Sequence, residues 1–176
     1  MTLAILLAVT CGTERWNVKT AKDAAAEKID PTAQTATILD LRNRTPPASW
    51  SNAMPRQPEE KETLTVVAFL DGFKSESDSD YHVGIPDAQG LTMVVEFPAP
   101  GCLTGSHLKA KAKAARAALE HVLNVPITTS YKKMKKNTVR LQVTGVFFWD
   151  KKHGVPGARA PNGAELHPVV NVEWLH

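Results

Sequence analysis

Residues 64–97 read LTVVAFLDGFKSESDSDYHVGIPDAQGLTMVVEF, and this stretch decides the class of fold. It contains three segments rich in β-branched and aromatic residues, at 64–73, 81–85 and 91–97, and the last two alternate between apolar and polar side chains. Such segments are typical of β-strands when turn residues, such as those at 87–90, separate them. The stretch therefore predicts a mainly β domain.

The chain beyond this stretch predicts one helix and two more strands. Residues 107–124 place apolar side chains on one stripe at helical spacing, and Ser106 is a suitable N-cap. Residues 138–149 (TVRLQVTGVFFW) and 167–175 again have the composition of strands. The expected order is three strands, a helix and two strands.

This order resembles the oligonucleotide/oligosaccharide-binding (OB) fold, a five-stranded Greek-key barrel with one helix between strands three and four. The resemblance covers about residues 63–175 and implies a mainly β, α+β architecture. A different small α+β sheet with one covering helix is the alternative. The segments SDYH (79–82) and APNGAELHP (160–168) also resemble a group of uncharacterised secreted bacterial proteins, a likeness that implies no particular activity.

The region before the barrel is expected to be a partly helical arm followed by a linker. Residues 22–28 and 32–42 have helical composition, whereas 45–62 contains four prolines and a charged end, which is typical of an extended or mobile linker. The sequence thus divides into a stretch that resembles a signal remnant, the arm with its linker, and the OB-like domain, at 1–10, 11–62 and 63–176.

The N-terminus and the cysteines favour export. Leu3–Val9 (LAILLAV) resembles the apolar part of a secretory signal but lacks the usual preceding basic residues, and a buried strand or helical turn is the alternative. Cys11 and Cys102 are the two cysteines, which in an exported chain predicts one disulfide; lipid attachment at Cys11 is the competing use. We expect a secreted, periplasmic or cell-envelope protein without a membrane-spanning segment, because no apolar run approaches about 18 residues.

Composition and motifs exclude several classes of protein. With 176 residues, 43% hydrophobic and 22% charged, the chain is neither disordered nor a disulfide-dense miniprotein. It has no dinucleotide-binding or phosphate-binding glycine motif, no zinc-protease motif and no CxxC pair. A function must therefore be sought in clusters of polar side chains.

Strand alternation brings histidines and carboxylates to the face opposite the apolar core. His82, Glu96 and the pair Glu165 and His167 each point away from the apolar side chains of their strands. In the OB barrel strand three lies beside strands two and five, so these side chains are expected to be neighbours. Imidazole and carboxylate groups together bind transition metals or act as acid and base.

The sequence therefore predicts a site for one divalent metal ion that acts on a phosphodiester. The expected catalytic residues are Asp80, His82, His153, Glu165 and His167. The expected metal ligands are Asp80, His82, Glu96, Glu165 and His167. The alternative is that these residues form a hydrated, polar outer face.

Positive charge is concentrated in residues 107–140, which contain nine Lys and Arg against the single acid Glu120, although the whole chain carries only +3. Such a patch attracts polyanions through phosphate contacts, unless it is merely a solvated surface. The expected nucleic-acid contacts are Lys109, Lys113, Arg116, Lys132, Lys133, Lys135, Lys136 and Arg159. Aromatic candidates for base stacking are Phe73, Tyr81, Phe148 and Trp149.

Two functions remain open at this point. The first is an exported barrel that binds nucleic acid or a similar polyanion and hydrolyses it as a metal-dependent nuclease. The second is a non-catalytic envelope module that binds a glycan or a protein partner. Clustering of the histidines and carboxylates around one centre would favour the first.

Overall fold

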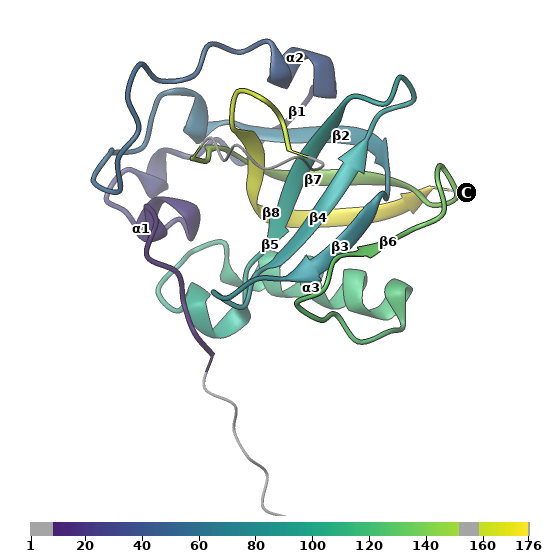
Figure 1. Ribbon diagram of the computed structural model, residues 1–176. Helices are drawn as coiled ribbons and strands as arrows, with labels where there is room; N and C mark the ends of the chain where they lie inside the picture. Colours follow the sequence, from purple (N-terminus) through teal and green to yellow (C-terminus); the bar gives the residue numbers. More distant parts are fainter. Residues whose placement is uncertain (1–8, 152–158, 176) are drawn as a thin grey trace, which may run out of the picture.

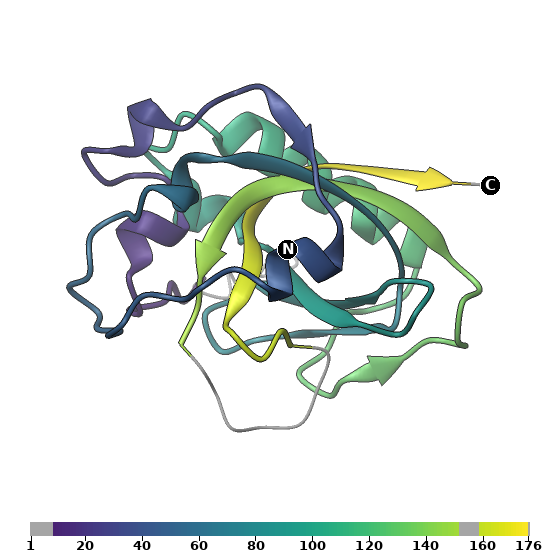
Figure 2. The ribbon, with the colours of Figure 1, turned by 90° about the horizontal axis from the view of Figure 1, so that it is seen from above.

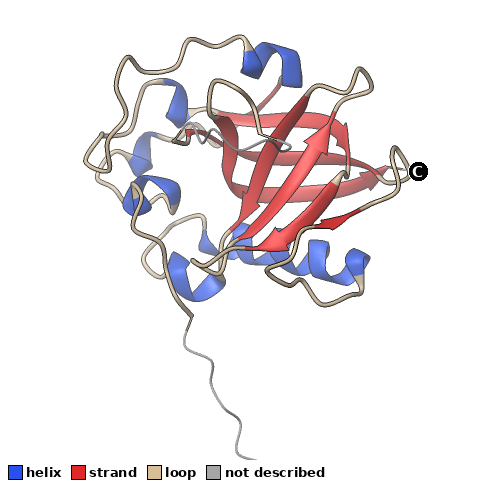
Figure 3. Cartoon of the chain, in the orientation of Figure 1, coloured by secondary structure: helices blue, strands red, loops and turns tan. Residues whose placement is uncertain are grey.

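The computed structural model describes residues 9–151 and 159–175, which form one curved sheet with helices packed around it (Figures 1 and 3). The strands are β1 (Ala33–Thr35), β2 (Thr63–Phe69), β3 (Gly72–Ser75), β4 (Tyr81–Pro86), β5 (Thr92–Phe97), β6 (Lys132–Lys133), β7 (Arg140–Trp149) and β8 (Ala164–Leu175). The helices are α1 (Trp16–Lys19), α2 (Ile38–Arg42) and α3 (Lys109–Leu123), and short 3₁₀ turns occupy Ala26–Lys28, Glu59–Lys61 and Pro100–Leu103. Among these described helices, none combines the length and apolarity that crossing a membrane requires.

The described strands form a single sheet in the order β1-β2-β7-β8-β5-β4-β3-β6. The pairs β1–β2 and β5–β8 are parallel, and the other pairs are antiparallel. The expected first strand is divided, because its two halves, β2 and β3, pair with β7 and β4 respectively. Figure 2 shows how strongly the sheet curves. A mainly β fold is confirmed, but the described residues form a sheet of eight strands that is not closed, so the five-stranded barrel is not confirmed.

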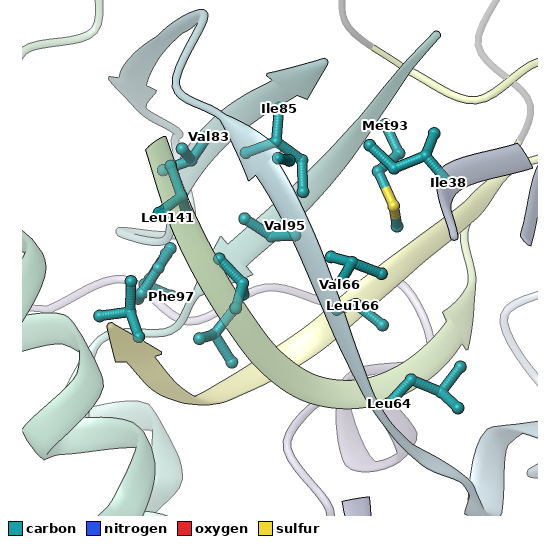
Figure 4. Close-up of a cluster of buried hydrophobic side chains, with 14 of the residues drawn as sticks. Ile38, Leu64, Val66, Val83, Ile85, Met93, Val95, Phe97, Leu141 and Leu166 are labelled. Carbon is teal, nitrogen blue, oxygen red and sulfur yellow. The ribbon is translucent and has the colours of Figure 1, made fainter. Parts of the chain in front are cut away.

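Apolar side chains on the concave face of this sheet form the main core (Figure 4). Alternation along β4 and β5 sends Val83, Ile85, Met93 and Val95 into it, as predicted, and each is at most 1% exposed. Burying a side chain of this size contributes about 1.5–3 kcal/mol. The core therefore fixes which face of each strand is left for polar groups.

Strand β8 departs from the simple alternation that the sequence suggests. Its core positions are Leu166, Val169 and Val172, whereas Val170 packs against a second apolar cluster. The pairing of β7 with β8 shifts register between Thr144 and Phe147, and this irregularity changes the face to which the following residues point. Strict alternation from Leu166 would place Val170 on the core face, and it fails here for this reason.

The N-terminal region packs on the sheet and does not project as an arm. Helix α2 begins at Thr37, whose hydroxyl accepts a hydrogen bond from the Asp40 amide at 3.0 Å in a capping box. The expected helix at 22–28 is reduced to one 3₁₀ turn, and part of the predicted helix at 32–42 is the edge strand β1. Strand β1 is exposed and is held by main-chain pairing with β2, a contact that local helical propensity does not reveal.

The proline-rich linker is held in place by two buried arginines. Arg15 makes a two-pronged ion pair with Glu60, at 2.7 Å for each nitrogen–oxygen pair, and also donates to the Met54 carbonyl. Arg56 donates to the Val18 carbonyl at 2.7 Å and pairs with Asp23. The segment at 45–62, which the sequence predicts to be extended or mobile, is therefore irregular and tied to the residues that precede α2.

A disulfide joins Cys11 to Cys102, as predicted, across 91 residues of chain. It connects the N-terminal segment, defined here as residues 11–23, to the 3₁₀ turn that follows β5. In Figure 1 this segment, in purple, passes along the left side of the sheet. The bridge and the two arginines fix the N-terminal segment over the polar face of β5 and β8.

Candidate metal centre

The four polar side chains that the alternation pattern selected lie together with Asp80 and are buried. Asp80, His82, Glu96, Glu165 and His167 are each at most 4% exposed. His82 lies opposite Glu96 in the β4–β5 pair, and Glu165 is in register with Val94 in the parallel β5–β8 pair. Their strand neighbours Val83, Val95 and Leu166 lie in the apolar core, so the strand residues of the cluster point to the opposite face. This face is buried, because Lys19 of the N-terminal segment contacts both Glu96 and His167.

The centre of the cluster is a group formed by Asp80, Glu96 and His167. His167 Nε2 lies 3.0 Å from Asp80 Oδ2 and 3.3 Å from Glu96 Oε2. One potential ligand atom from each of these residues lies within 4.8 Å of the other two. This spacing is compatible with one metal ion between them, since metal–nitrogen and metal–oxygen bonds are about 2.0–2.2 Å long.

The other nitrogen of the His167 ring determines the state of this group. His167 Nδ1 lies 2.9 Å from the main-chain carbonyl of Lys19, which can only accept a hydrogen bond, so Nδ1 carries a proton. Nε2 then presents either a lone pair or a second proton to the two carboxylates. The two carboxylates repel a lone pair on Nε2 unless a cation lies between them. A histidine that binds a metal ion through one ring nitrogen usually donates a hydrogen bond from the other, often to a main-chain carbonyl.

A second, adjacent group contains Glu76, His82 and Glu96. His82 Nδ1 lies 3.2 Å from Glu96 Oε1 and 3.3 Å from Glu76 Oε1. Burial opposes protonation of His82, but hydrogen bonds to both carboxylates raise its pKa overall. The hydrogen bond from His82 in turn lowers the pKa of Glu76 to about 2. Lys74, at 3.0 Å, also neutralises Glu76, so this second group is already supplied with positive charge.

The carboxylate of Glu165 is the least compensated group of the cluster. Its Oε1 atom is buried and has no hydrogen-bond partner among the described residues. Burial, together with the neighbouring charges of Glu96 and Asp150, raises the pKa of Glu165 well above its usual range. Glu96 behaves in the opposite way: burial alone would raise its pKa, but Lys19 and the two histidines lower it. Glu96 Oε2 likewise lacks a hydrogen bond within the described chain.

Negative charge exceeds positive charge in and around this cluster. Among the described residues six carboxylates gather here, against three permanently charged basic groups. The carboxylates are those of Glu76, Asp78, Asp80, Glu96, Asp150 and Glu165, and the basic groups are those of Lys19, Lys74 and Arg159. Buried carboxylates in excess require protons or a bound cation, which suits a divalent metal.

A polar cavity of about 410 Å³ opens onto the cluster from the side of the N-terminal segment. Its wall includes both positive and negative groups as well as one aromatic ring. These residues include Trp16, Lys19, Glu76, Asp78, Glu96, Asp150 and Arg159. Arg159 bridges two parts of the wall, with Nη1 3.1 Å from Asp150 Oδ2 and Nη2 3.5 Å from Glu76 Oε1. Glu96 and Lys19, although buried, therefore form part of the wall of this cavity.

The predicted nucleic-acid contacts are separated by the structure. Lys113, Lys132, Lys133, Lys135 and Lys136 are exposed, and Lys109 and Arg159 are half-buried. Arg116 is only 8% exposed and donates to the carbonyls of Ser79 and Phe97, while its guanidinium lies 3.4 Å from the centre of the Tyr81 ring. Arg116 therefore fixes the loop that carries Asp80 and is not part of the basic surface. His153 lies outside the described residues.

Most of the aromatic candidates are buried and unavailable for base stacking. Phe73, Phe148 and Trp149 are each at most 1% exposed, and Tyr81 is half-buried under Arg116. Phe148 does point away from the main core, as expected from its alternation with Phe147, but its ring lies 5.9 Å from the ring of His167. It therefore forms part of the apolar surroundings of the candidate metal centre.

Two residues of the cluster, Lys19 and Glu76, were not predicted from the sequence. Glu76 lies in a loop that has no pattern of its own, four residues before Asp80, the last residue of the SESDSD run. Lys19 comes from a segment far away in the sequence, and the one available clue was the disulfide, which places the region after Cys11 near Cys102. Comparison of the chain with protein-family models and with curated proteins gives no significant match.

Proposed function

We propose that this protein is an exported phosphodiesterase that requires a divalent metal ion and acts on nucleic acid or a similar polyanion. The observation that carries this proposal is the group formed by Asp80, Glu96 and His167, in which Lys19 fixes the histidine proton on Nδ1. The resulting arrangement offers one nitrogen and two carboxylate oxygens to a cation. Mixed nitrogen and oxygen ligands suit zinc, manganese or iron better than calcium.

The cation would be held by Asp80, Glu96 and His167, and Glu165 is near enough to Glu96 to affect its charge. A divalent cation in such a site polarises a phosphate oxygen and lowers the pKa of a bound water molecule. The chain itself supplies the rest of the environment. His82 holds Glu96 from its Oε1 side, and Phe148 and Trp16 limit access of water to His167.

Basic groups on and beside the cavity support an anionic substrate. Lys19 and Arg159 lie in the cavity wall, where the other charged side chains among the described residues are carboxylates. The exposed strand β6, with Lys132 and Lys133, pairs with β3, and β3 ends one residue before Glu76. A polyanion that follows β6 and β3 would thus be led toward the cavity, and its phosphates would release counterions on binding.

The strand arrangement supports an OB-like fold for residues 63–175. In the central part of the sheet the order β2-β7-β8-β5-β4-β3 begins and ends with the two halves of one segment, and β5 and β8 are parallel. Expected strand one is divided into β2 and β3, and expected strands two to five are β4, β5, β7 and β8. In that numbering the order of the central strands is 1-4-5-3-2-1. Export is supported by the Cys11–Cys102 disulfide, because such bridges persist in oxidising compartments.

The experiment that tests this proposal measures metal content and hydrolysis together. Purified protein should bind close to one equivalent of Mn²⁺ or Zn²⁺ and hydrolyse single-stranded DNA or bis(p-nitrophenyl) phosphate, and EDTA should abolish the hydrolysis. Protein that binds no metal, or whose hydrolysis survives EDTA, would contradict the proposal. Metal binding without hydrolysis of any phosphodiester would favour the alternative of a non-catalytic module that binds a glycan or protein.

His167→Asn provides the sharpest variant for this test. An asparagine amide can still donate to the Lys19 carbonyl, but it provides no counterpart of Nε2, so the local fold is kept and one ligand is lost. We expect metal affinity to fall at least tenfold, within the range usual for altered metal surroundings, and hydrolysis to fall with it. His121→Asn, at an exposed position of α3, is the matched control and should change neither.

A further inference from the structure

The ammonium group of Lys19 is the one permanently charged group that α1 brings to the polar cavity. Lys19 is 6% exposed, and its side chain lies in the cavity wall beside Glu96 and Asp150. The neighbouring carboxylates of Glu96 and Asp150 favour the charged form of this ammonium. Lys19 therefore stays positively charged in a place from which most water is excluded.

The ion pairs of this ammonium are long. Lys19 Nζ lies 3.5 Å from Glu96 Oε2 and 3.8 Å from Asp150 Oδ1. Charge-assisted hydrogen bonds between nitrogen and oxygen are usually about 2.7–2.9 Å long. Within the described chain neither contact has hydrogen-bond geometry, so the N–H donors of Lys19 are available to an oxygen atom that enters the cavity.

The position of Lys19 is fixed by groups other than its own side chain. Its main-chain carbonyl contacts His167, and the neighbouring Val18 carbonyl accepts from Arg56. Arg15, at the start of α1, is held by Glu60 and three main-chain carbonyls. The side-chain ammonium is thus not needed to hold α1 on the sheet, and its placement is explained by a role in the cavity.

We propose that Lys19 is a catalytic residue that contacts a non-bridging oxygen of the substrate phosphate. This inference rests on the proposed phosphodiesterase function. The Oε2 atom of Glu96, a proposed metal ligand, lies 3.5 Å from Lys19 Nζ and 3.3 Å from His167 Nε2. The ammonium is therefore next to the proposed metal site and close to any phosphate bound there. A bare metal site of carboxylates would repel that phosphate.

The chemical role of Lys19 is electrostatic, and no bond to it is formed. In the hydrolysis, the oxygen of a water molecule bonds to phosphorus and the bond from phosphorus to the leaving oxygen breaks. One proton of that water ends on the leaving oxygen, which departs as an alcohol, and the other is released by the monoester product. Negative charge on the non-bridging oxygens is stabilised by a donor that is already in place, with little solvent to reorganise.

Lys19→Met tests this role, because methionine keeps the apolar length of the side chain and removes the charge. We expect turnover of bis(p-nitrophenyl) phosphate to fall about 10²–10³-fold, as for loss of one preorganised donor. Affinity for Mn²⁺ should be unchanged or higher, because a positive charge near the ligands is removed. Inorganic phosphate should bind the Mn²⁺-loaded wild type, measured by calorimetry, and should bind the variant at least tenfold more weakly. Lys28→Met, at an exposed position of the same region, is the control and should change none of these.

The outcomes separate this inference from the proposed function. Wild-type turnover or wild-type phosphate affinity in the methionine variant overturns the inference, as does a loss of Mn²⁺ affinity that matches the loss of turnover. If the methionine variant does not fold, Lys19→Arg is the second test. A folded arginine variant whose turnover lies within about tenfold of wild type supports a role for the charge. An arginine variant that binds Mn²⁺ but not phosphate refutes this role. If the wild type binds Mn²⁺ and phosphate but hydrolyses no diester, the proposed function fails, and the phosphate affinity of the methionine variant still tests the contact.

Discussion

Removal of the Cys11–Cys102 bridge should lower the stability of the whole fold by several kilocalories per mole. The bridge spans 91 residues, and the loop-entropy relation then gives about 15.5 cal/mol/K, or about 4.6 kcal/mol at 25 °C, of stabilisation relative to the unbridged unfolded chain. With a urea m-value of about 2 kcal/mol/M, this difference lowers the unfolding midpoint by about 2 M.

The double variant Cys11→Ala and Cys102→Ala measures this effect in urea-unfolding experiments followed by tryptophan fluorescence. We expect the variant to fold in the absence of urea, because Arg15 and Arg56 still hold the N-terminal segment through buried ion pairs. Wild-type protein reduced with a dithiol should show the same midpoint as the variant, which controls for the effect of the alanines. Midpoints of oxidised and reduced protein within about 0.5 M of each other would refute the reasoning, because the bridge would then not constrain the unfolded chain.

Two further predictions concern the charged groups away from the metal centre. A variant with Gln at Lys132, Lys133, Lys135 and Lys136 should bind single-stranded DNA more weakly, and to a similar degree for all sequences. The slope of log affinity against log salt concentration should fall by up to about 3, because each phosphate contact contributes about 0.7. An unchanged slope in fluorescence-anisotropy titrations would show that this surface does not contact the polyanion. Glu60→Gln should lower the free energy of unfolding in urea by about 3–5 kcal/mol, because it leaves the fully buried Arg15 without its counter-charge. The neighbouring control Glu59→Gln, in a less buried position, should lower it by less than about 1 kcal/mol.

The excess of buried carboxylates explains why the metal and the stability of the fold should be linked. Glu165 and Glu96 each bury an oxygen that lacks a hydrogen bond within the described chain, and such groups normally reduce stability. A cation that binds the folded chain but not the unfolded one offsets this cost by mass action. If a cation binds as proposed, the free energy of unfolding should therefore rise with the concentration of the metal ion.

The amino-acid sequence by itself determined the mainly β class, the disulfide and the face on which the polar residues lie. The period of two in β4 and β5 sends His82 and Glu96 to the side opposite Val83 and Val95, and this holds wherever one face of a strand is buried. Two cysteines with no other partner in the chain left one pairing. These features follow from local spacing and from counting, which do not depend on how distant segments pack.

The tertiary structure alone decided that the polar face is buried and which residues complete it. Lys19 and Glu60 acquire their roles only because the N-terminal segment and the linker fold back over β5 and β8, and no periodicity within those segments encodes that contact. The register shift between β7 and β8 that exchanges Val169 for Val170 likewise depends on the pairing of two strands. A buried charge is tolerated only where several distant groups neutralise it together, so the sequence shows the individual charges while their cluster exists only in the folded chain.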